Sequence, residues 1–239
     1  METFIFILIV LVASILQTST GFGFSILATP FLLFLFEPLE AIQLNLLLSL
    51  VISSVLILKI RQDIDLGILK RFVIGSTAAL PVGILIFALL DMRQLKLGIG
   101  LFLLAVTILL LFNFRIALTK SKDLVVGGIS GALTASIGMP GPPILVYFSG
   151  ADTLKEKVRA TTLAFYLFIY STSLIIQVLF VGTAKSIWVA GGYGLPIVVV
   201  GLFLGQRLFN RINQTAFRFI MYAILLITGV YLLVENWPY

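Results

Sequence analysis

The stretch LQTSTGFGFSILATPFLLF, residues 16–34, returns in altered form as LTASIGMPGPPILVYFSG, residues 133–150. Glycines interrupt an uncharged apolar run in both, and prolines join them in the second. Gly21 recurs as Gly138, at a shift of 117 residues. Corresponding hydrophobic segments that Gly or Pro interrupts are typical of the binding sites of secondary transporters. A broken helix is tolerated at membrane depth only where protein or water satisfies its backbone groups. The paired breaks therefore predict a ligand site.

The composition is that of a polytopic membrane protein. The 239 residues are 60% hydrophobic and 11% charged, with a mean hydropathy of +1.18, more apolar surface than a soluble domain can bury. Cys and His are absent, which excludes thiol nucleophiles, imidazole or thiolate metal sites and Ser-His catalysis. No Walker motif is present. We therefore expect no enzyme, no cofactor and no metal.

Terminal and surface charge also fit a membrane protein. The first apolar run has no basic region before it, so we expect no cleaved signal peptide. The net charge of +6 is expected to come from loops at a membrane surface and not from nucleic-acid binding.

Eight apolar segments divide into two kinds. Six have the length that crosses a bilayer, namely residues 41–58, 72–90, 97–114, 160–182, 186–206 and 212–234. The other two, residues 3–36 and 124–151, carry no charge and are too long for one helix but too short for two full crossings. Each is either a single tilted helix or a re-entrant hairpin with its glycine tip at mid-membrane.

Loop charge favours the hairpins. If both segments return to the side they entered, loops 59–71, 115–123, 152–159 and 207–218 share one face and hold 13 of the 16 basic residues. If both cross, the split is eight against eight. The positive-inside rule therefore predicts hairpins, cytoplasmic basic loops and both termini outside the cytoplasm. Trp188 and Trp237 then lie at the outer interface.

The hairpins imply an internal inverted repeat. A hairpin followed by three crossings places the second half upside down relative to the first. We expect an all-α fold of two inverted repeats, residues 1–118 and 119–239, in one integral membrane domain. Pro81 and Pro196, and Arg93 and Arg211, pair at shifts close to 117.

The two breaks predict an anion site without a buried cation, because Arg218, near the start of residues 212–234, is the only Asp, Glu, Lys or Arg inside a predicted span. Helices that begin after Gly23 and Gly141 would aim free N–H groups and positive dipole ends at the centre. The alternative is that these glycines only permit close helix packing. The candidate substrate-binding residues are Thr20, Gly21, Phe22, Gly23, Phe24, Ser25, Asn45, Gly138, Met139, Pro140, Gly141, Thr161 and Thr162.

A polar stripe runs along the helix after each hairpin. The stripes consist of Asn45, Ser49 and Ser53 in the first half and of Thr162, Tyr166, Tyr170, Ser173 and Gln177 in the second. Helical periodicity puts each stripe on one face, as a ligand contact or as packing with hydroxyls bonded to their own helix. We favour packing for Ser53 and Ser173 and ligand contact for Asn45 and Thr162. Arg159 is either a positive-inside anchor or a group that attracts the anion.

At these motifs the chain resembles the sulfite exporter TauE/SafE family of membrane permeases. The resemblance rests on GFGFSILATP (residues 21–30), GGISGALTASIGMPGPP (127–143) and the helix openings AIQLNLL and VRATTLA, and it covers nearly the whole chain. It implies transport of a small sulfur oxyanion or organosulfonate.

Three functions remain open. The leading hypothesis is a secondary permease in the cytoplasmic membrane that moves a small anion by rocking one repeat against the other. The alternatives are a passive anion channel and a non-transporting membrane scaffold. Substrate, direction, coupling ion and oligomeric state are left open by the sequence.

Overall fold

The described part of the chain is helical throughout. The computed structural model describes residues 2–89, 91–112, 117–149, 153–211 and 213–236. These residues form ten α-helices and one 3-10 turn, namely α1 (Glu2–Thr20), α2 (Phe24–Leu32), α3 (Pro38–Ile60), η1 (Arg61–Asp63), α4 (Leu66–Leu89), α5 (Met92–Leu111), α6 (Lys120–Ile137), α7 (Gly141–Ser149), α8 (Lys155–Phe180), α9 (Lys185–Arg211) and α10 (Gln214–Asn236).

The protein is an all-α, multi-pass membrane protein, as the sequence predicts. The main part of each of the six predicted crossings lies on one helix, α3, α4, α5, α8, α9 or α10, while residues 90, 113, 114 and 212 of these predictions lie outside the described residues. By length and composition, five helices in the described residues can span a membrane, namely α1, α3 with η1, α4, α8 and α9. The described apolar parts of α5 and α10, Lys96–Leu109 and Leu225–Glu235, are shorter.

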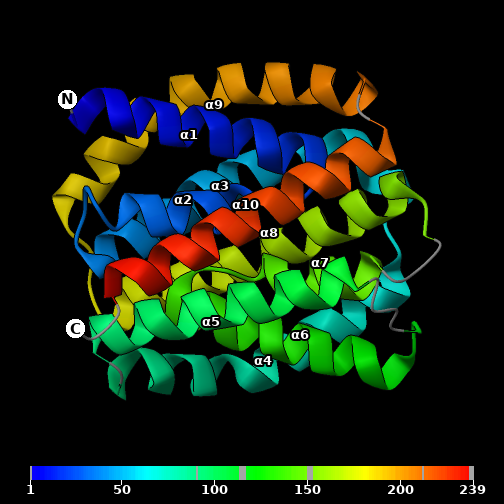
Figure 1. The fold of residues 1–239 in the computed structure, drawn as a ribbon, viewed down its shortest axis with the longest axis horizontal. Coiled ribbons are helices and arrows are strands. Elements are labelled where there is room, and N and C mark those ends of the chain that lie inside the picture. The colour runs from blue at the N-terminus through cyan, green and yellow to red at the C-terminus, as the bar shows by residue number, and fades with distance from the viewer. Residues whose placement is uncertain (1, 90, 113–116, 150–152, 212, 237–239) are drawn as a thin grey trace.

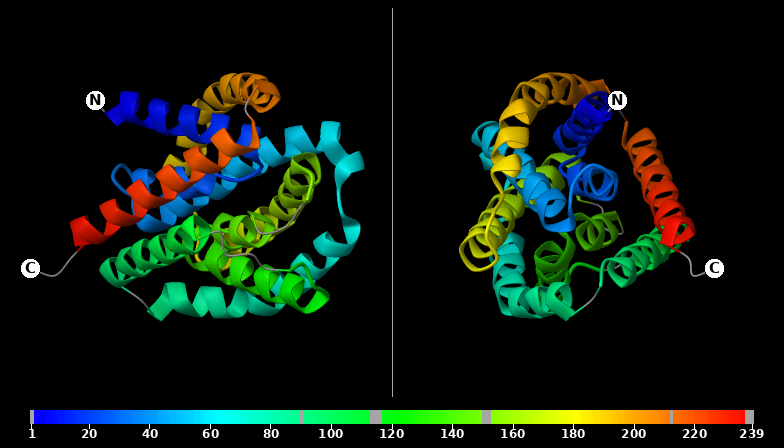
Figure 2. Two further views of the ribbon diagram at one scale, coloured as in Figure 1. Left: turned by 45° about the vertical axis from the view of Figure 1, so that its right-hand side comes forward. Right: turned by 90° about the vertical axis from the view of Figure 1, so that its left-hand side faces the viewer.

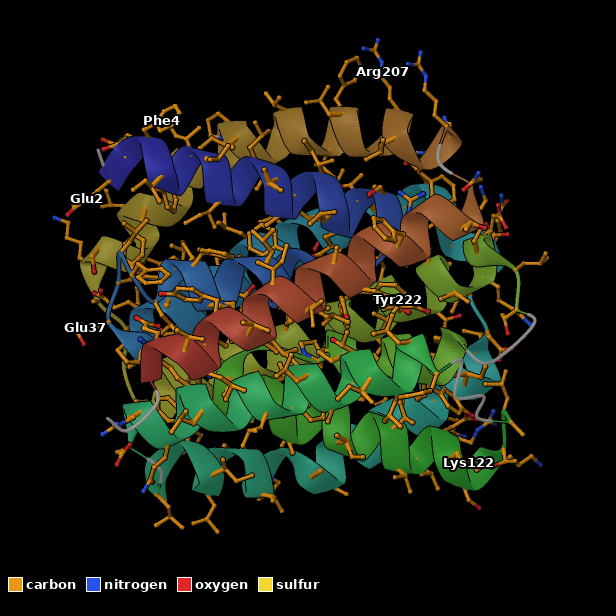
Figure 3. The ribbon with its side chains drawn as sticks, in the orientation of Figure 1. Glu2, Phe4, Glu37, Lys122, Arg207 and Tyr222 are labelled. Atoms are coloured by element: carbon orange, nitrogen blue, oxygen red, sulfur yellow. The ribbon has the colours of Figure 1, made fainter. Side chains whose placement is uncertain are left out.

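Each of the two unusual segments is a long helix followed by a short one. α1 has 19 residues and α2 has 9, and α6 has 18 and α7 has 9. Glu2, at the start of α1, and Glu37, after α2, lie at the same end of the molecule (Figure 3). α2 therefore runs back towards the end where α1 begins, as a hairpin requires (Figure 1).

The loops predicted to share one face meet at one end of the bundle. The Lys157 ammonium lies 2.9 Å from the Asp65 carboxylate, and the Lys155 ammonium lies over the Phe209 ring. Lys122 and Arg207 lie at this end in Figure 3, opposite Glu2 and Glu37. We call it the basic end. Which side of a membrane it faces stays a prediction.

Helix packing follows the same pattern in both halves. α1 packs on α9 and α6 packs on α4, so each long broken helix lies against the fourth helix of the other half. α3 packs on α8 and α5 packs on α10, which are corresponding helices. Seen along the long axis, α4, α5, α9 and α10 lie at the periphery and α2 lies inside (Figure 2). This is the packing an internal repeat would give, and its inverted relation stays a prediction.

Two charged groups are buried close to the basic end, because α6 and α8 begin four to five residues before the predicted segments. Asp123 on α6 is 2% exposed. Its carboxylate accepts from Arg71 Nε on α4 at 2.5 Å and from the Tyr147 hydroxyl on α7. Arg159 on α8 is also 2% exposed. Both groups lie just before the predicted segments that begin at residues 124 and 160, in helices that continue into those segments.

We predict that Gly131→Ala destabilises the protein, because α4 and α6 touch at this glycine. A methyl group on Gly131 would lie 2.6 Å from Ser76 Cα, a backbone atom that moves only with its helix. Overpacking of this kind costs about 1–3 kcal/mol. Thermal unfolding in detergent measures it. The matched control is Gly192→Ala on α9, where nothing lies within 4 Å. That variant should equal or exceed the wild-type melting temperature, since Ala favours helix more than Gly. Equal losses in both variants would contradict the packing argument.

We predict a pH-dependent contribution from Asp65, which joins the start of α4 to α8. The hydrogen bond from Lys157 holds the pKa of this carboxyl below its usual 3.8. The stabilisation is therefore complete above the unfolded pKa and is lost as pH falls through the lower folded pKa. Asp65→Asn should cost about 0.2–1 kcal/mol at pH 7, and this difference in melting temperature from wild type should shrink below about pH 4.

The Asp65→Ala variant separates the ion pair from the helix cap. Asp65 Oδ1 also accepts from the N–H groups of Gly67 and Ile68 at 3.0 Å. Asn retains that acceptor and Ala does not, so Ala should lower stability further at every pH. A pH-independent difference between wild type and Asp65→Asn would refute the ion-pair contribution.

Candidate functional site

The first break spans Gly21 to Gly23, between α1 and α2. Gly21 has φ 85° and Gly23 has φ 125°, values that side chains other than glycine rarely adopt. The Thr20 hydroxyl accepts from the Phe22 N–H at 3.0 Å and contacts the Phe22 carbonyl. The same hydroxyl donates to the Leu16 carbonyl at 2.6 Å, so Thr20 ties the centre of the break back to α1.

The second break spans Gly138 to Pro140, between α6 and α7. Gly138 has φ 71° and ends α6 in the left-handed conformation. Its N–H donates to the Thr134 carbonyl at 2.9 Å. Its own carbonyl accepts from Asn45 Nδ2 on α3 at 2.8 Å. Asn45 therefore positions the break from a neighbouring helix, whereas the first break is satisfied by a residue of its own helix.

The two breaks are offset from each other towards different ends of the bundle. A methyl group on Gly21 would lie 3.0 Å from Cα of Arg159, one turn inside α8. A methyl group on Gly138 would lie 3.2 Å from Ile42 Cγ2, one turn inside α3. The first arm of each hairpin is about twice as long as the second, and the depth of the tips in a membrane stays a prediction.

The short helices nevertheless bring their N-termini together. Gly141 begins α7, and a methyl group there would lie 3.3 Å from Cδ1 of Ile26, in the first turn of α2. One side chain therefore spans the gap between the two N-termini. Both helix ends are positive because the peptide dipoles of each helix align.

Two tyrosines of α8 place a hydroxyl at these N-termini. The Tyr166 hydroxyl oxygen lies 2.9 Å from a methyl group built on Gly141. The Tyr170 hydroxyl lies 3.5 Å from Ser25 Oγ, in the first turn of α2. Both rings are fully buried, with centroids 4.9 Å apart. Tyr166 and Tyr170 are one helical turn apart, so α8 serves both broken ends.

Several buried polar atoms of the stripes have no hydrogen-bond partner among the described residues. They are Asn45 Oδ1, Ser49 Oγ, Thr162 Oγ1, Tyr166 OH, Ser173 Oγ and Gln177 Oε1. Native proteins rarely leave such atoms unsatisfied. Ser53 is different, because its hydroxyl accepts from Gln17 Nε2 on α1 at 3.1 Å. The prediction of packing thus fits Ser53, while Ser173 has an unpartnered oxygen.

The structure brings most predicted site residues together and turns one away. Thr20 to Ser25 and Gly138 to Gly141 are buried at the two breaks, with Asn45 beside Gly138. Thr161 is buried, but its hydroxyl accepts from the Asp65 N–H at 2.9 Å, so it holds the η1–α4 linker. Phe22, Phe24 and Met139 are at most 2% exposed.

The sequence matches the model of one protein family, described as sulfite exporter TauE/SafE, over residues 6–232. This chain belongs to that family. TauE/SafE proteins are membrane transporters and not enzymes, so the fold and the paired breaks belong to a transport protein. No curated protein and no solved structure matches the sequence.

Sequence reasoning missed two features of this TauE/SafE site. Tyr166 and Tyr170 stand on the polar stripe but were not among the predicted ligands; their alignment with Ser49 and Ser53 at the shift of 117 was the available signal. The second feature is the pair Pro142 and Pro143 in the first turn of α7. Proline has no N–H, so α7 presents fewer backbone donors than the sequence analysis assumed.

We predict that Thr162→Val leaves the unliganded protein at least as stable as wild type. Valine keeps the shape of threonine and removes a buried hydroxyl oxygen that has no partner, a change that is neutral or favourable by up to about 1 kcal/mol. Asn45→Ala is the comparison, because it leaves the buried Gly138 carbonyl without its donor and should cost about 1–3 kcal/mol. Thermal unfolding without anion measures both. A large loss in Thr162→Val would mean that its hydroxyl has a partner.

Proposed function

We propose that this protein is a secondary transporter that moves a small anion, a sulfur oxyanion or an organosulfonate, across the cytoplasmic membrane. The observation that supports this most directly is the approach of the N-termini of α2 and α7, which a single Ile26 side chain spans. Each N-terminus is equivalent to about half a positive charge. Together they stabilise an anion without a full cation at the site.

The two sides of the proposed site offer different donors. The first intrahelical bond of α2 runs from the Leu27 N–H to the Gly23 carbonyl, so the N–H groups before it have no acceptor in their own helix. On the α7 side, Pro142 and Pro143 lack N–H groups, and the Tyr166 hydroxyl lies there as a donor. The anion is thus bound by backbone groups of α2 and by a phenol next to α7.

Alternating access follows from the proposed inverted repeat. We propose that residues 1–118 and 119–239 are inverted repeats and that one rocks against the other around the bound anion. The reciprocal packing of α1 on α9 and of α6 on α4 supports this. Because the basic loops share one end, we place that end in the cytoplasm and both termini outside.

Flux into proteoliposomes distinguishes a carrier from a channel. In proteoliposomes, a carrier shows saturable flux, and unlabelled anion on the far side accelerates entry of labelled anion. A passive channel shows neither. A non-transporting scaffold shows no flux and no anion-dependent rise in melting temperature. Sulfite, thiosulfate, taurine and sulfoacetate are the ligands to screen.

We predict that Tyr166→Phe weakens anion binding about tenfold, the loss of one hydrogen bond to a charged group. Since the hydroxyl has no protein partner among the described residues, the unliganded melting temperature should stay at or above wild type. Tyr193→Phe is the matched control, because Tyr193 is 73% exposed on α9 and should bind as wild type does. Titration calorimetry in detergent measures all three affinities. Unchanged affinity in folded Tyr166→Phe would remove this hydroxyl from the site.

A further inference from the structure

A cationic cluster lies outside the two broken ends, between α8 and α9 at the basic end. The Arg159 guanidinium carbon lies 4.2 Å from the Phe209 ring centroid, and Nη2 donates to Gln206 Oε1 at 2.9 Å. The Lys155 ammonium lies 4.7 Å from the same centroid. Two cations therefore share one aromatic ring.

The described residues give this cluster one ion-pair partner, and it is exposed. Within the described residues, no carboxylate lies at ion-pair distance from Arg159, and the partner of Lys155 is its exposed neighbour Glu156 at 3.9 Å. Arg159 is 2% exposed, and its buried Nε has no acceptor. A buried charge is normally paired. Contact with the Phe209 ring offsets only part of the cost of desolvating the Arg159 charge. Repulsion from the Lys155 ammonium adds to that cost.

The cluster adjoins the first break. Cα, Cβ and Cγ of Arg159 lie within 3.4 Å of a methyl group built on Gly21. At the second break the corresponding neighbour is Ile42, which carries no charge. The cationic neighbour thus occurs beside only one of the two breaks, the one at the basic end.

We infer that Arg159, Lys155 and Phe209 form a second oxyanion site, where an anion binds between the solution at the basic end and the broken helices. This inference rests on the proposed function, because the anion that binds here is the one that the protein transports. A tetrahedral oxyanion accepts a hydrogen bond from the free Arg159 Nε–H, and its negative charge reduces the repulsion between the two cations. A lipid phosphate has the same chemistry. The burial of Arg159 against Gly21 favours the transported anion over a headgroup, which stays at the membrane surface.

The test counts bound anions. Equilibrium dialysis of radiolabelled sulfoacetate against the purified protein in detergent should give two equivalents per chain. The sulfoacetate at the Arg159 site should be the more weakly bound of the two. Its affinity should fall as the salt concentration rises, since Lys155 is partly exposed. Arg159→Gln should remove this equivalent and leave the other affinity within about threefold, because the second site is separate. Lys155→Gln, at a more exposed position, should weaken it about tenfold and serves if Arg159→Gln does not fold.

Arg207→Gln is the matched control. The Arg207 guanidinium carbon also lies over a ring, 4.0 Å from the Phe203 centroid, but Arg207 and Phe203 are exposed. The variant loses the same charge and the same kind of ring contact, and it should keep both equivalents.

The outcomes separate the second site from the proposed function. If wild type binds one equivalent of sulfoacetate, and Arg159→Gln and Lys155→Gln still bind it, the second site is refuted and the central site is retained. One equivalent that Arg159→Gln abolishes overturns the two-site arrangement. No binding by wild type overturns the proposed function itself, and the second site with it. If Arg159→Gln loses phosphatidylglycerol binding but keeps both equivalents of sulfoacetate, the Arg159 site belongs to a lipid.

Discussion

The structure depends on satisfying backbone hydrogen bonds where two membrane helices stop short. In hydrocarbon each unpaired N–H or carbonyl costs several kcal/mol, so the breaks need local partners. The first break uses Thr20, whose hydroxyl accepts from the Phe22 N–H and donates to the Leu16 carbonyl of its own helix. At the second break, Asn45 from α3 donates to the Gly138 carbonyl. Pro140 has no N–H group, so no acceptor is needed there. Different side chains thus solve the same backbone problem.

Small residues then fix the broken helices against the opposite half. Gly201 and Gly205 of α9 lie against Ser14 and Thr18 of α1. Gly127 and Gly131 of α6 lie against Phe72 and Ser76 of α4. Membrane helices associate mainly by van der Waals contact, since lipid chains are as apolar as leucine, and small residues allow the backbones to approach. Close helix packing is therefore the role of these four glycines, while ligand binding at the glycines of the two breaks stays a proposal.

The sequence predicted what depends on local pattern. Apolar length located the six helices α3, α4, α5, α8, α9 and α10, and glycine with proline located both breaks. Three features depended on tertiary contact and could not be predicted. The offset between the two breaks follows from unequal arm lengths, the role of Thr161 follows from where the Asp65 linker lies, and the contact of Arg159 with Phe209 joins residues 50 positions apart. The lost donors of Pro142 and Pro143 were visible in the sequence, but their importance depends on α7 beginning at Gly141.

The two halves share a backbone plan and differ in side-chain chemistry, and this difference bears on the proposed transport cycle. If the halves are inverted repeats, as we propose, reciprocal packing would let one backbone plan form both an inward and an outward arrangement. At the shift of 117, Ser25 and Ile26 correspond to Pro142 and Pro143, and Arg159 corresponds to Ile42. Backbone donors and the buried cation therefore lie on the side of the first break. An anion in the proposed site meets unequal surroundings towards the two ends, so the two access states differ in free energy even where their backbones match.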